Sequence, residues 1–404
     1  MGNLNETANA DRVHIGIFGC RNVGKSSLIN AITNQEISIV SDVKGTTTDP
    51  VSKAMELLPL GPIVIYDTPG FDDDDKLLGE KRVERVKKIL NRTDIAVLVL
   101  SSDVEPNSFD IEIENLLIKK NVPYIVAINK SDLVSDLDIN SYLKNIKEKN
   151  NVISVSAFSK HNINELKEML SKIKIDNNDK SLVGDIVKKD DLIVLVTPID
   201  ESAPKGRMIL PQVQVIRDIL DHDAIPVVTK ETTLENLLKT LGKKPDFVIT
   251  DSQAFKIVDE IVPKDIPLTS FSILLARYKG FLKTAINGVN SIKNIEDGDT
   301  VLISEGCTHH RQCNDIGTTK IPNLLKKITG KNFSIETSSG YDFPDDLSKY
   351  KMIIHCGGCM VTEKEMLYRM NCANDANVPF INYGIFIAFA NGILDRSIAN
   401  VPIK

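Results

Sequence analysis

The stretch GCRNVGKS, residues 19–26, decides the fold of the first part of this 404-residue chain. It matches the pattern GxxxxGK[ST] and stands between an apolar, β-branched run at 13–18 and a helical run at 27–33. Glycines in such a loop let backbone N–H groups face phosphates, the lysine reaches the β and γ oxygens, and the serine hydroxyl ligates Mg²⁺. A chance match in a turn is the alternative, and it weakens as further parts of a nucleotide site follow. The candidate phosphate-binding residues are Gly19, Asn22, Val23, Gly24, Lys25, Ser26 and Ser27.

Short apolar runs alternate with helical patterns around this loop, from Val13 to about Ile175. The runs lie at 13–18, 63–66, 95–100, 124–128 and 152–155. Strands that are apolar on both faces are typical of a parallel sheet with helices on both sides. Residues 1–175 therefore predict a doubly wound α/β domain.

The second apolar run ends in Asp67-Thr68-Pro69-Gly70. Ligands of open parallel sheets bind at the carboxyl ends of the strands. Asp67 is therefore expected to hold Mg²⁺ through water, and the N–H of Gly70 is expected to contact the γ-phosphate.

Two further motifs at predicted strand ends point to the base. After the run at 124–128 comes Asn129-Lys130-Ser131-Asp132, and after the run at 152–155 comes Ser156-Ala157. A carboxylate at 132 accepts two hydrogen bonds from guanine, which adenine does not supply, so adenine would leave it desolvated and unpaired. The backbone at 156–157 meets the guanine O6, and the predicted nucleotide is GTP or GDP.

The rest of the chain divides into three predicted parts. Residues 176–191 are charged and polar and are expected to be a linker. Residues 192–268 alternate strands and helices without a catalytic pattern, which predicts a small α/β domain for positioning or self-association. Residues 269–404 predict a second small α/β domain, and they contain five of the six cysteines.

Cysteines and histidines in this last part gather after two apolar runs. Cys307-Thr308-His309 follows the run at 301–303, and His355-Cys356-Gly357-Gly358-Cys359 follows the run at 352–354. If these two strands lie side by side, their loops come within reach of one metal site. A redox pair of the CxxC type leaves Cys307 unused. A zinc site of three cysteines and His309 and an iron–sulfur cluster both fit, and spacing alone does not choose between them.

Composition narrows the class of protein. The formal net charge is −6 and aromatic residues make up 5% of the chain, so we expect neither a nucleic acid nor a membrane as partner. The first twelve residues lack the order of a secretory signal, which predicts a cytoplasmic protein with reduced cysteines. The longest uncharged stretch, 378–394, contains proline and glycine and predicts a buried helix.

With these motifs in place, residues 1–175 resemble the TrmE and Era branch of the translation-factor-like GTPases. Gly45-Thr46-Thr47-Thr48-Asp49 looks like the switch I motif of that branch, and the resemblance assigns Thr47 to Mg²⁺ and the γ-phosphate. Phe71 stands where Ras-like enzymes have the glutamine that orients water. TrmE-like members use a potassium ion held by an asparagine at the place of Asn22. The resemblance implies slow, potassium-stimulated GTP hydrolysis with Lys25, Thr47, Asp67 and Gly70 as catalytic residues.

The GTPase motifs and the cysteine motif together resemble the HydF family of [FeFe]-hydrogenase maturation GTPases. The resemblance implies a [4Fe–4S] cluster on Cys307, Cys356 and Cys359, with His309 and His355 as candidate ligands or neighbours. It further implies a carrier that receives a diiron precursor from the radical-SAM maturases HydE and HydG and passes it to apo-[FeFe]-hydrogenase. Residues 192–268 become a dimerisation domain of a homodimer or larger oligomer. The alternative is an RNA- or ribosome-directed GTPase with a structural zinc site.

Overall fold

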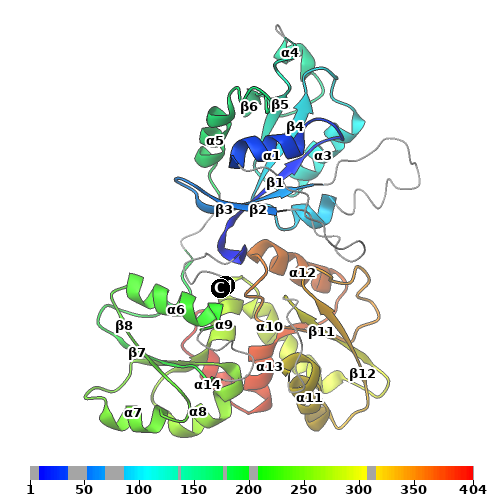
Figure 1. Ribbon diagram of the computed structural model, residues 1–404. Coiled ribbons are helices and arrows are strands. Elements are labelled where there is room, and N and C mark those ends of the chain that lie inside the picture. Colours follow the sequence, from blue (N-terminus) through cyan, green and yellow to red (C-terminus); the bar gives the residue numbers. More distant parts are fainter. Residues whose placement is uncertain are drawn as a thin grey trace. The chain divides into compact units, whose positions relative to one another are not determined.

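A computed structural model describes residues 9–34, 52–68, 86–134, 138–175, 180–199, 208–306 and 315–403. The chain forms two compact units, Met1–Asn177 and Asn178–Lys404, which Figure 1 colours from blue to green and from green to red. Within the described ranges, no helix is both long and apolar enough to cross a lipid bilayer.

The first unit contains one six-stranded sheet in the order β2-β3-β1-β4-β5-β6. All neighbouring strands are parallel except β2 and β3, which form an antiparallel pair. Its strands are β1 (Val13–Phe18), β2 (Ser52–Leu57), β3 (Gly61–Asp67), β4 (Ile95–Ser101), β5 (Tyr124–Asn129) and β6 (Val152–Ser154). Its helices are η1 (Asn9–Asp11), α1 (Lys25–Thr33), α3 (Ser108–Lys119), α4 (Ile139–Tyr142) and α5 (Ile163–Lys172).

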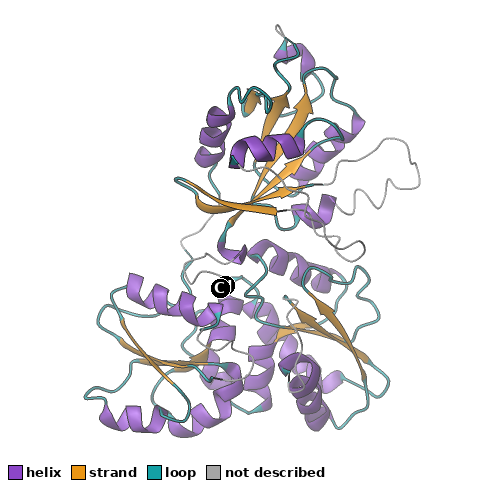
Figure 2. Ribbon diagram, in the orientation of Figure 1, coloured by secondary structure: helices purple, strands orange, loops and turns teal. Residues whose placement is uncertain are grey.

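Helices cover both faces of this sheet, as the orange strands between purple helices show in Figure 2. One hydrophobic cluster joins Ile17 of β1 to Leu28 of α1 and Leu166 of α5. Another joins Phe18, the next residue of β1, to Ile113 of α3. Successive side chains of a strand point to opposite faces, so both faces of β1 are buried. The predicted doubly wound α/β domain is confirmed.

The second unit contains two four-stranded sheets in which all neighbouring strands are parallel, in the orders β10-β9-β7-β8 and β12-β11-β13-β14. The strands are β7 (Leu192–Val196), β8 (Ile225–Thr229), β9 (Phe247–Thr250), β10 (Leu268–Ser270), β11 (Thr300–Glu305), β12 (Ser334–Ser339), β13 (Met352–His355) and β14 (Phe380–Asn382). The helices up to β11 are α6 (Leu210–Asp221), α7 (Leu234–Thr240), η2 (Ser252–Ala254), α8 (Phe255–Ile261), α9 (Phe271–Tyr278), α10 (Leu282–Val289) and η3 (Asn290–Asn294). The later ones are η4 (Ile316–Lys320), α11 (Ile321–Thr329), α12 (Glu363–Asp375), α13 (Tyr383–Ala390) and α14 (Leu394–Ile398).

The two sheets share one hydrophobic core, which joins β7 residues to β11 and β13 residues. The expected boundary at 268/269 falls inside strand β10. The expected linker at 176–191 is corrected in part. Leu182, Val183 and Val187 are buried in this core. These apolar side chains pack the segment onto the second unit, although charged residues precede and follow them in the sequence.

Two expected helices also differ from the structure. The sequence pattern at 270–289 predicts one helix. The structure has two there, α9 and α10, and Gly280 between them has a φ of 76°, which favours glycine. The uncharged stretch at 378–394 begins with strand β14 and continues as α13. A short buried apolar run does not by its periodicity distinguish a strand from a helix.

Candidate functional site

The loop at 19–24 is shaped by glycines that no other residue replaces without strain. Gly19 has a φ of 144°, and an added Cβ would lie 2.3 Å from the carbonyl oxygen of Val99 on β4. Gly24 has a φ of 90°, stands at the N-terminus of α1, and would place a Cβ 2.3 Å from Nδ2 of Asn129. Both positions keep the loop close to β4 and β5, with the start of α1 directly behind it. This is the geometry that directs backbone N–H groups toward phosphates.

Lys25 is folded back over the loop it follows. Its Nζ donates to the carbonyl oxygens of Gly19 (2.9 Å) and Cys20 (2.7 Å), and the residue is 6% exposed. Burial lowers the pKa of Lys25, although Asp67 counteracts this effect. The two carbonyl oxygens hold the ammonium group at the opening of the loop. Phosphate oxygens of a nucleotide bind the same ammonium group at this position.

Ser26 and Asp67 form the part of the site that suits Mg²⁺. The hydroxyl of Ser26 donates to Oδ2 of Asp67 over 2.5 Å. Oδ1 of Asp67 is buried and has no hydrogen-bond partner among the described residues. A buried carboxylate oxygen without a partner costs free energy that a cation relieves, and hydroxyl and carboxylate oxygens are ligands that Mg²⁺ prefers. These residues therefore fit a magnesium ion.

Asn129 connects its own loop by hydrogen bonds to the loops that contain Val23 and Ala157, at the carboxyl ends of the strands. Its Nδ2 donates to the carbonyl oxygen of Val23 (2.9 Å), and its Oδ1 accepts from the N–H of Ala157 (3.0 Å). Its side chain is buried at 2% exposure. Two hydrogen bonds of one side chain thus join the phosphate loop to the two motifs predicted to recognise the base.

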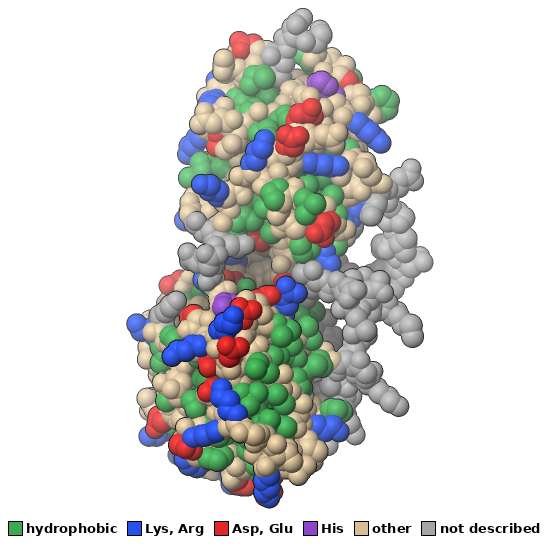
Figure 3. All heavy atoms as spheres, turned by 90° about the vertical axis from the view of Figure 1, so that its left-hand side faces the viewer, with side chains coloured by type: hydrophobic (Ala, Val, Ile, Leu, Met, Phe, Trp, Pro, Cys, Tyr) green, Lys and Arg blue, Asp and Glu red, His purple; other side chains and the backbone are tan. Residues whose placement is uncertain are grey.

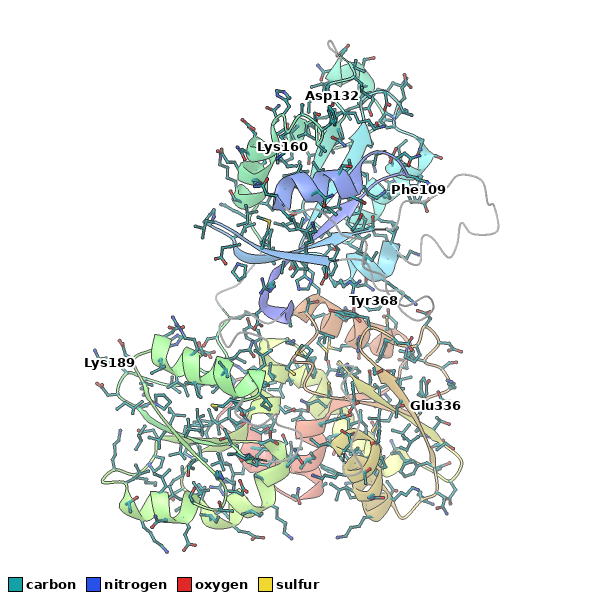
Figure 4. The ribbon with its side chains drawn as sticks, in the orientation of Figure 1. Phe109, Asp132, Lys160, Lys189, Glu336 and Tyr368 are labelled. Carbon is teal, nitrogen blue, oxygen red and sulfur yellow. The ribbon has the colours of Figure 1, made fainter. Side chains whose placement is uncertain are left out.

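Asp132 lies at the mouth of the base site, and Figure 4 shows it together with Lys160 beyond the ends of β5 and β6. Its Oδ1 accepts a hydrogen bond from the hydroxyl of Ser156 (2.5 Å). The preceding Lys130 has a φ of 61° and pairs with Asp103 over 3.3 Å. The hydroxyl of Ser156 on the next loop thus orients the carboxylate of Asp132.

Several predicted site residues lie outside the described residues. These are Thr47, Gly70, Cys307 and His309. Asn22 is described and has a φ of 61°, which gives the phosphate loop a left-handed turn. Its assignment to potassium stays a prediction.

The two strands that precede the cysteines are neighbours, as predicted. β11 and β13 are parallel, with Ser304 opposite His355. The N–H of Cys356 donates to the carbonyl oxygen of Ser304 (2.9 Å). The N–H of Gly306 donates to Sγ of Cys356 (3.1 Å). Gly306, which contacts Cys356, is the residue directly before Cys307 in the sequence.

The turn that follows β13 is called the CxxC loop here and comprises residues 356–361. Gly358 has a φ of 67°, and an added Cβ would lie 2.7 Å from Sδ of Met366. Its N–H donates to Sγ of Cys356 (3.3 Å), so this sulfur receives two backbone hydrogen bonds. Burial raises the pKa of the Cys356 thiol to about 11. A sulfur surrounded by N–H donors fits a metal-bound thiolate, because the metal removes the proton and the donors stabilise the negative charge.

His355 is not arranged as a metal ligand in this structure. Its Nδ1 lies 2.8 Å from the carbonyl oxygen of Cys356, and its Nε2 lies 3.0 Å from the guanidinium of Arg369. The ring is fully buried, and burial together with the Arg369 charge lowers the pKa of His355 to about 3. Since Arg369 always donates, Nε2 accepts and Nδ1 donates. Of its two predicted roles, the structure favours that of a neighbour that orients the CxxC loop.

Among the described ranges, no group of three or more His, Cys, Asp or Glu side chains is placed to hold a metal ion. Neither Cys356 nor Cys359 forms a disulfide with another described residue. Cys307, the third predicted thiol ligand, lies outside the described residues. This arrangement leaves iron and zinc both open.

An exposed apolar surface lies on α6 and β8 of the second unit, where Figure 3 shows hydrophobic side chains gathered. Val213 and Leu220 of α6 and Ile225 and Val228 of β8 are between 45% and 53% exposed. β8 is the edge strand of its four-stranded sheet, so its outer N–H and C=O groups have no neighbour among the described strands. Exposed apolar side chains beside an open strand edge are typical of a protein–protein contact.

Sequence reasoning missed three residues that build the cysteine site. Gly306 donates to Cys356, Lys279 donates to carbonyls of the CxxC loop, and Arg369 binds His355. A lysine and an arginine in helical patterns look like surface residues, so the sequence contains no signal for their burial. The CxH motif drew attention to residues 307–309, but nothing in the sequence indicated that the N–H of Gly306 donates to Cys356.

Three family models match the chain. One described as a 50S ribosome-binding GTPase matches residues 14–130, one described as a hydrogen maturase F dimerization domain matches 182–280, and one described as a hydrogen maturase F tetramerization domain matches 283–400. The last two cover almost all of the second unit. The first covers most of the sheet with the phosphate loop.

Curated relatives match mainly the first unit. The tRNA modification GTPase MnmE of Clostridioides difficile is 35% identical over 180 residues, which are 44% of this chain and 38% of that protein. MnmE of Alkaliphilus metalliredigens is 30% identical over 229 residues, 55% of this chain and 48% of that protein. The chain therefore spans less than half the length of these curated relatives.

Solved structures with similarity include Era and the translation elongation factor SelB. Era from Aquifex aeolicus is 21% identical with a TM-score of 0.33, and the match covers 57% of this chain and 98% of Era. The elongation factor SelB from Methanococcus maripaludis is 23% identical with a TM-score of 0.33, over 43% of this chain and 36% of SelB.

Proposed function

The chain belongs to the hydrogen maturase F family, and from this premise we propose that it is a GTP-hydrolysing scaffold for the metal centre of a hydrogenase. It binds a [4Fe–4S] cluster on Cys307, Cys356 and Cys359, and it assembles or transfers a diiron subcluster to apo-[FeFe]-hydrogenase. The radical-SAM maturases HydE and HydG supply the diiron precursor. The supporting observation is the hydrogen bond from Gly306 to Sγ of Cys356, because Gly306 directly precedes the CxH motif in the sequence and contacts the CxxC loop.

The chemistry that this site offers follows from its ligand set. Three cysteines leave one iron of a bound cluster open to an exchangeable ligand, which is the position that a diiron cargo requires. The residues of the chain bind and orient: Gly306 and Gly358 donate to Sγ of Cys356, and His355 holds the carbonyl of Cys356. The open position and the fourth ligand are parts of the proposal.

In this proposal, GTP hydrolysis switches the protein between two states of its nucleotide-binding loops. Lys25 exchanges the carbonyls of Gly19 and Cys20 for the β and γ oxygens, and Ser26 and Asp67 hold Mg²⁺. Thr47 and Gly70 contact the γ-phosphate, and a potassium ion on Asn22 takes the place of a catalytic side chain. Loss of the γ-phosphate then releases the loops that carry Thr47 and Gly70.

The cluster and its purpose are tested in one experiment. The purified protein is reconstituted anaerobically with iron and sulfide, loaded with diiron precursor, and mixed with apo-hydrogenase while hydrogen evolution is measured. We expect about four irons per chain, and replacing Cys307, Cys356 or Cys359 singly by serine abolishes both iron retention and hydrogenase activation. Cys372→Ser on α12 is the matched control and keeps both.

A different outcome would favour the alternative function. One zinc ion per chain with little iron, together with salt-sensitive RNA binding, would indicate a ribosome-directed GTPase with a structural zinc site. Hydrolysis rates that are equal in potassium and sodium salts would remove the role of Asn22.

Homo-oligomer formation is supported by the matches to a dimerization and a tetramerization domain. We propose that the apolar surface of α6 and β8 is one contact between two copies. An edge strand that carries Ile225 and Val228 can pair with the same strand of a second copy, which buries both side chains and satisfies the open backbone groups.

A further inference from the structure

The floor of the CxxC loop is helix α9, which Figure 1 shows between the sheet with β7 and the sheet with β11. An added Cβ on Gly357 would lie 3.5 Å from Oγ of Ser272 and 3.9 Å from Cδ1 of Leu275. Lys279, which follows α9 directly, reaches the same loop. Positions 272, 275 and 279 recur at helical spacing, so one face of this helix supports the loop.

Lys279 is a buried cation at the centre of that contact. It is 4% exposed, and its Nζ donates to the carbonyl oxygens of Gly358 and Val361. Gly358 stands between the two cysteines, and Val361 lies two residues after Cys359.

Burial of an ammonium group costs free energy unless charges and hydrogen bonds compensate for it. Two carbonyl oxygens compensate in part, and they hold the loop at the same time. A negatively charged group in the loop would compensate further. Three thiolates give an oxidised [4Fe–4S] core a net negative charge, and reduction by one electron increases it.

We propose that Lys279 is a positioning residue for the iron–sulfur cluster. Its ammonium fixes the CxxC loop through Gly358 and Val361 and places a positive charge in the loop that carries Cys356 and Cys359. This charge favours the reduced cluster and slows its loss. The inference rests on the proposed cluster. It adds Lys279 as a group that influences the retention and the reduction potential of the cluster. Lys279 lies in the segment matched by the dimerization-domain model.

Three variants separate charge from hydrogen bonding. Lys279→Met removes both, Lys279→Gln keeps N–H donors without charge, and Lys279→Arg keeps the charge. Lys283→Met is the matched control, because Lys283 is an exposed lysine on the neighbouring helix α10. Each full-length protein is reconstituted anaerobically, and the folded state of each is checked by circular dichroism.

Two readouts are measured: the rate of iron release to a chelator, and the midpoint potential from electron paramagnetic resonance during titration with dithionite. For the Met and Gln variants we expect iron release at least tenfold faster. Their equilibrium constant for one-electron reduction should fall at least tenfold, which is about 59 mV. Arg and the Lys283 control should stay close to wild type.

A Gln variant with wild-type potential and wild-type retention would overturn the inference, because a neutral donor would then serve equally well. If the Met variant does not fold, the Gln and Arg variants still decide between charge and hydrogen bonding. If the wild-type protein itself takes up no cluster, the proposed function fails, and this inference fails with it.

Discussion

Replacing Arg369 by methionine is the sharpest test of how the cysteine site is held. Arg369 is fully buried on α12 and binds three parts of the second unit. Its guanidinium donates to Oε1 of Glu365 (2.8 Å), Nε2 of His355 (3.0 Å) and the carbonyl oxygen of Gly340 (2.6 Å). Its Cζ also lies 5.2 Å from the ring centre of Phe343. α12, β13 and the turn after β12 are therefore joined by one side chain.

The magnitude follows from what the substitution leaves behind. Methionine fills much of the volume but leaves the carboxylate of Glu365, whose side chain is 5% exposed, without its ion-pair partner. Breaking a buried ion pair by removing one partner costs about 3–5 kcal/mol. We expect Arg369→Met to lower the free energy of unfolding of the second unit by this amount. Adding Glu365→Gln should recover about 1–3 kcal/mol, because the two residues are directly coupled.

The assay must report on the second unit alone, because two compact units need not unfold together. Hydrogen–deuterium exchange of β13 and α12 amides, read by mass spectrometry in the full chain, gives local opening free energies. The chain contains no tryptophan, so far-UV circular dichroism replaces fluorescence for the global transition. Arg217→Met is the control, because it breaks an exposed arginine–aspartate pair of the same helical spacing and should change little. A loss below about 1 kcal/mol for Arg369→Met would refute the reasoning.

Three further predictions concern the base site, the assembly and pH. Asp132→Asn should weaken GTP binding at least about 100-fold in calorimetry and favour xanthosine triphosphate, since the amide donates where the carboxylate accepted; unchanged GTP affinity would contradict it. Val228→Lys should shift the oligomer toward monomer in light scattering, because a lysine opposes pairing of the β8 edge; an unaltered mass would exclude this edge. Burial raises the pKa of Asp259, but hydrogen bonds from Lys264 and Arg396 outweigh it and lower that pKa overall. The carboxylate therefore stabilises the fold above its unfolded pKa of about 3.9. That stabilisation is lost as pH falls further, so the gap in melting temperature between wild type and Asp259→Asn should shrink below pH 4.

The sequence by itself determined the first unit and the positions of its nucleotide motifs. Each motif follows a strand that is apolar on both faces, so the residues directly after it lie at one edge of the sheet. Asp67 and Asn129 close β3 and β5, and Asp132 follows three residues later. The sequence also placed each cysteine segment directly after an apolar run, whereas the pairing of β11 with β13 was only a condition there and comes from the structure. Local chain order decides such positions, because a strand and the loop after it are covalently continuous.

Only the tertiary structure decided how charged and polar residues are used. The sequence pattern suggests surface positions for Lys279 and Arg369, yet both are buried, because carbonyl oxygens from distant segments accept hydrogen bonds from them. Strand β12, with the sequence SIETSS, is not predicted because it is polar. It forms because β11 supplies its backbone hydrogen bonds at the edge of the sheet. Leu182 and Val183 lie in the core of the second unit, although the segment that contains them is charged on both sides. In each case, the partners are far away in the sequence, and burial depends on packing that no local pattern encodes.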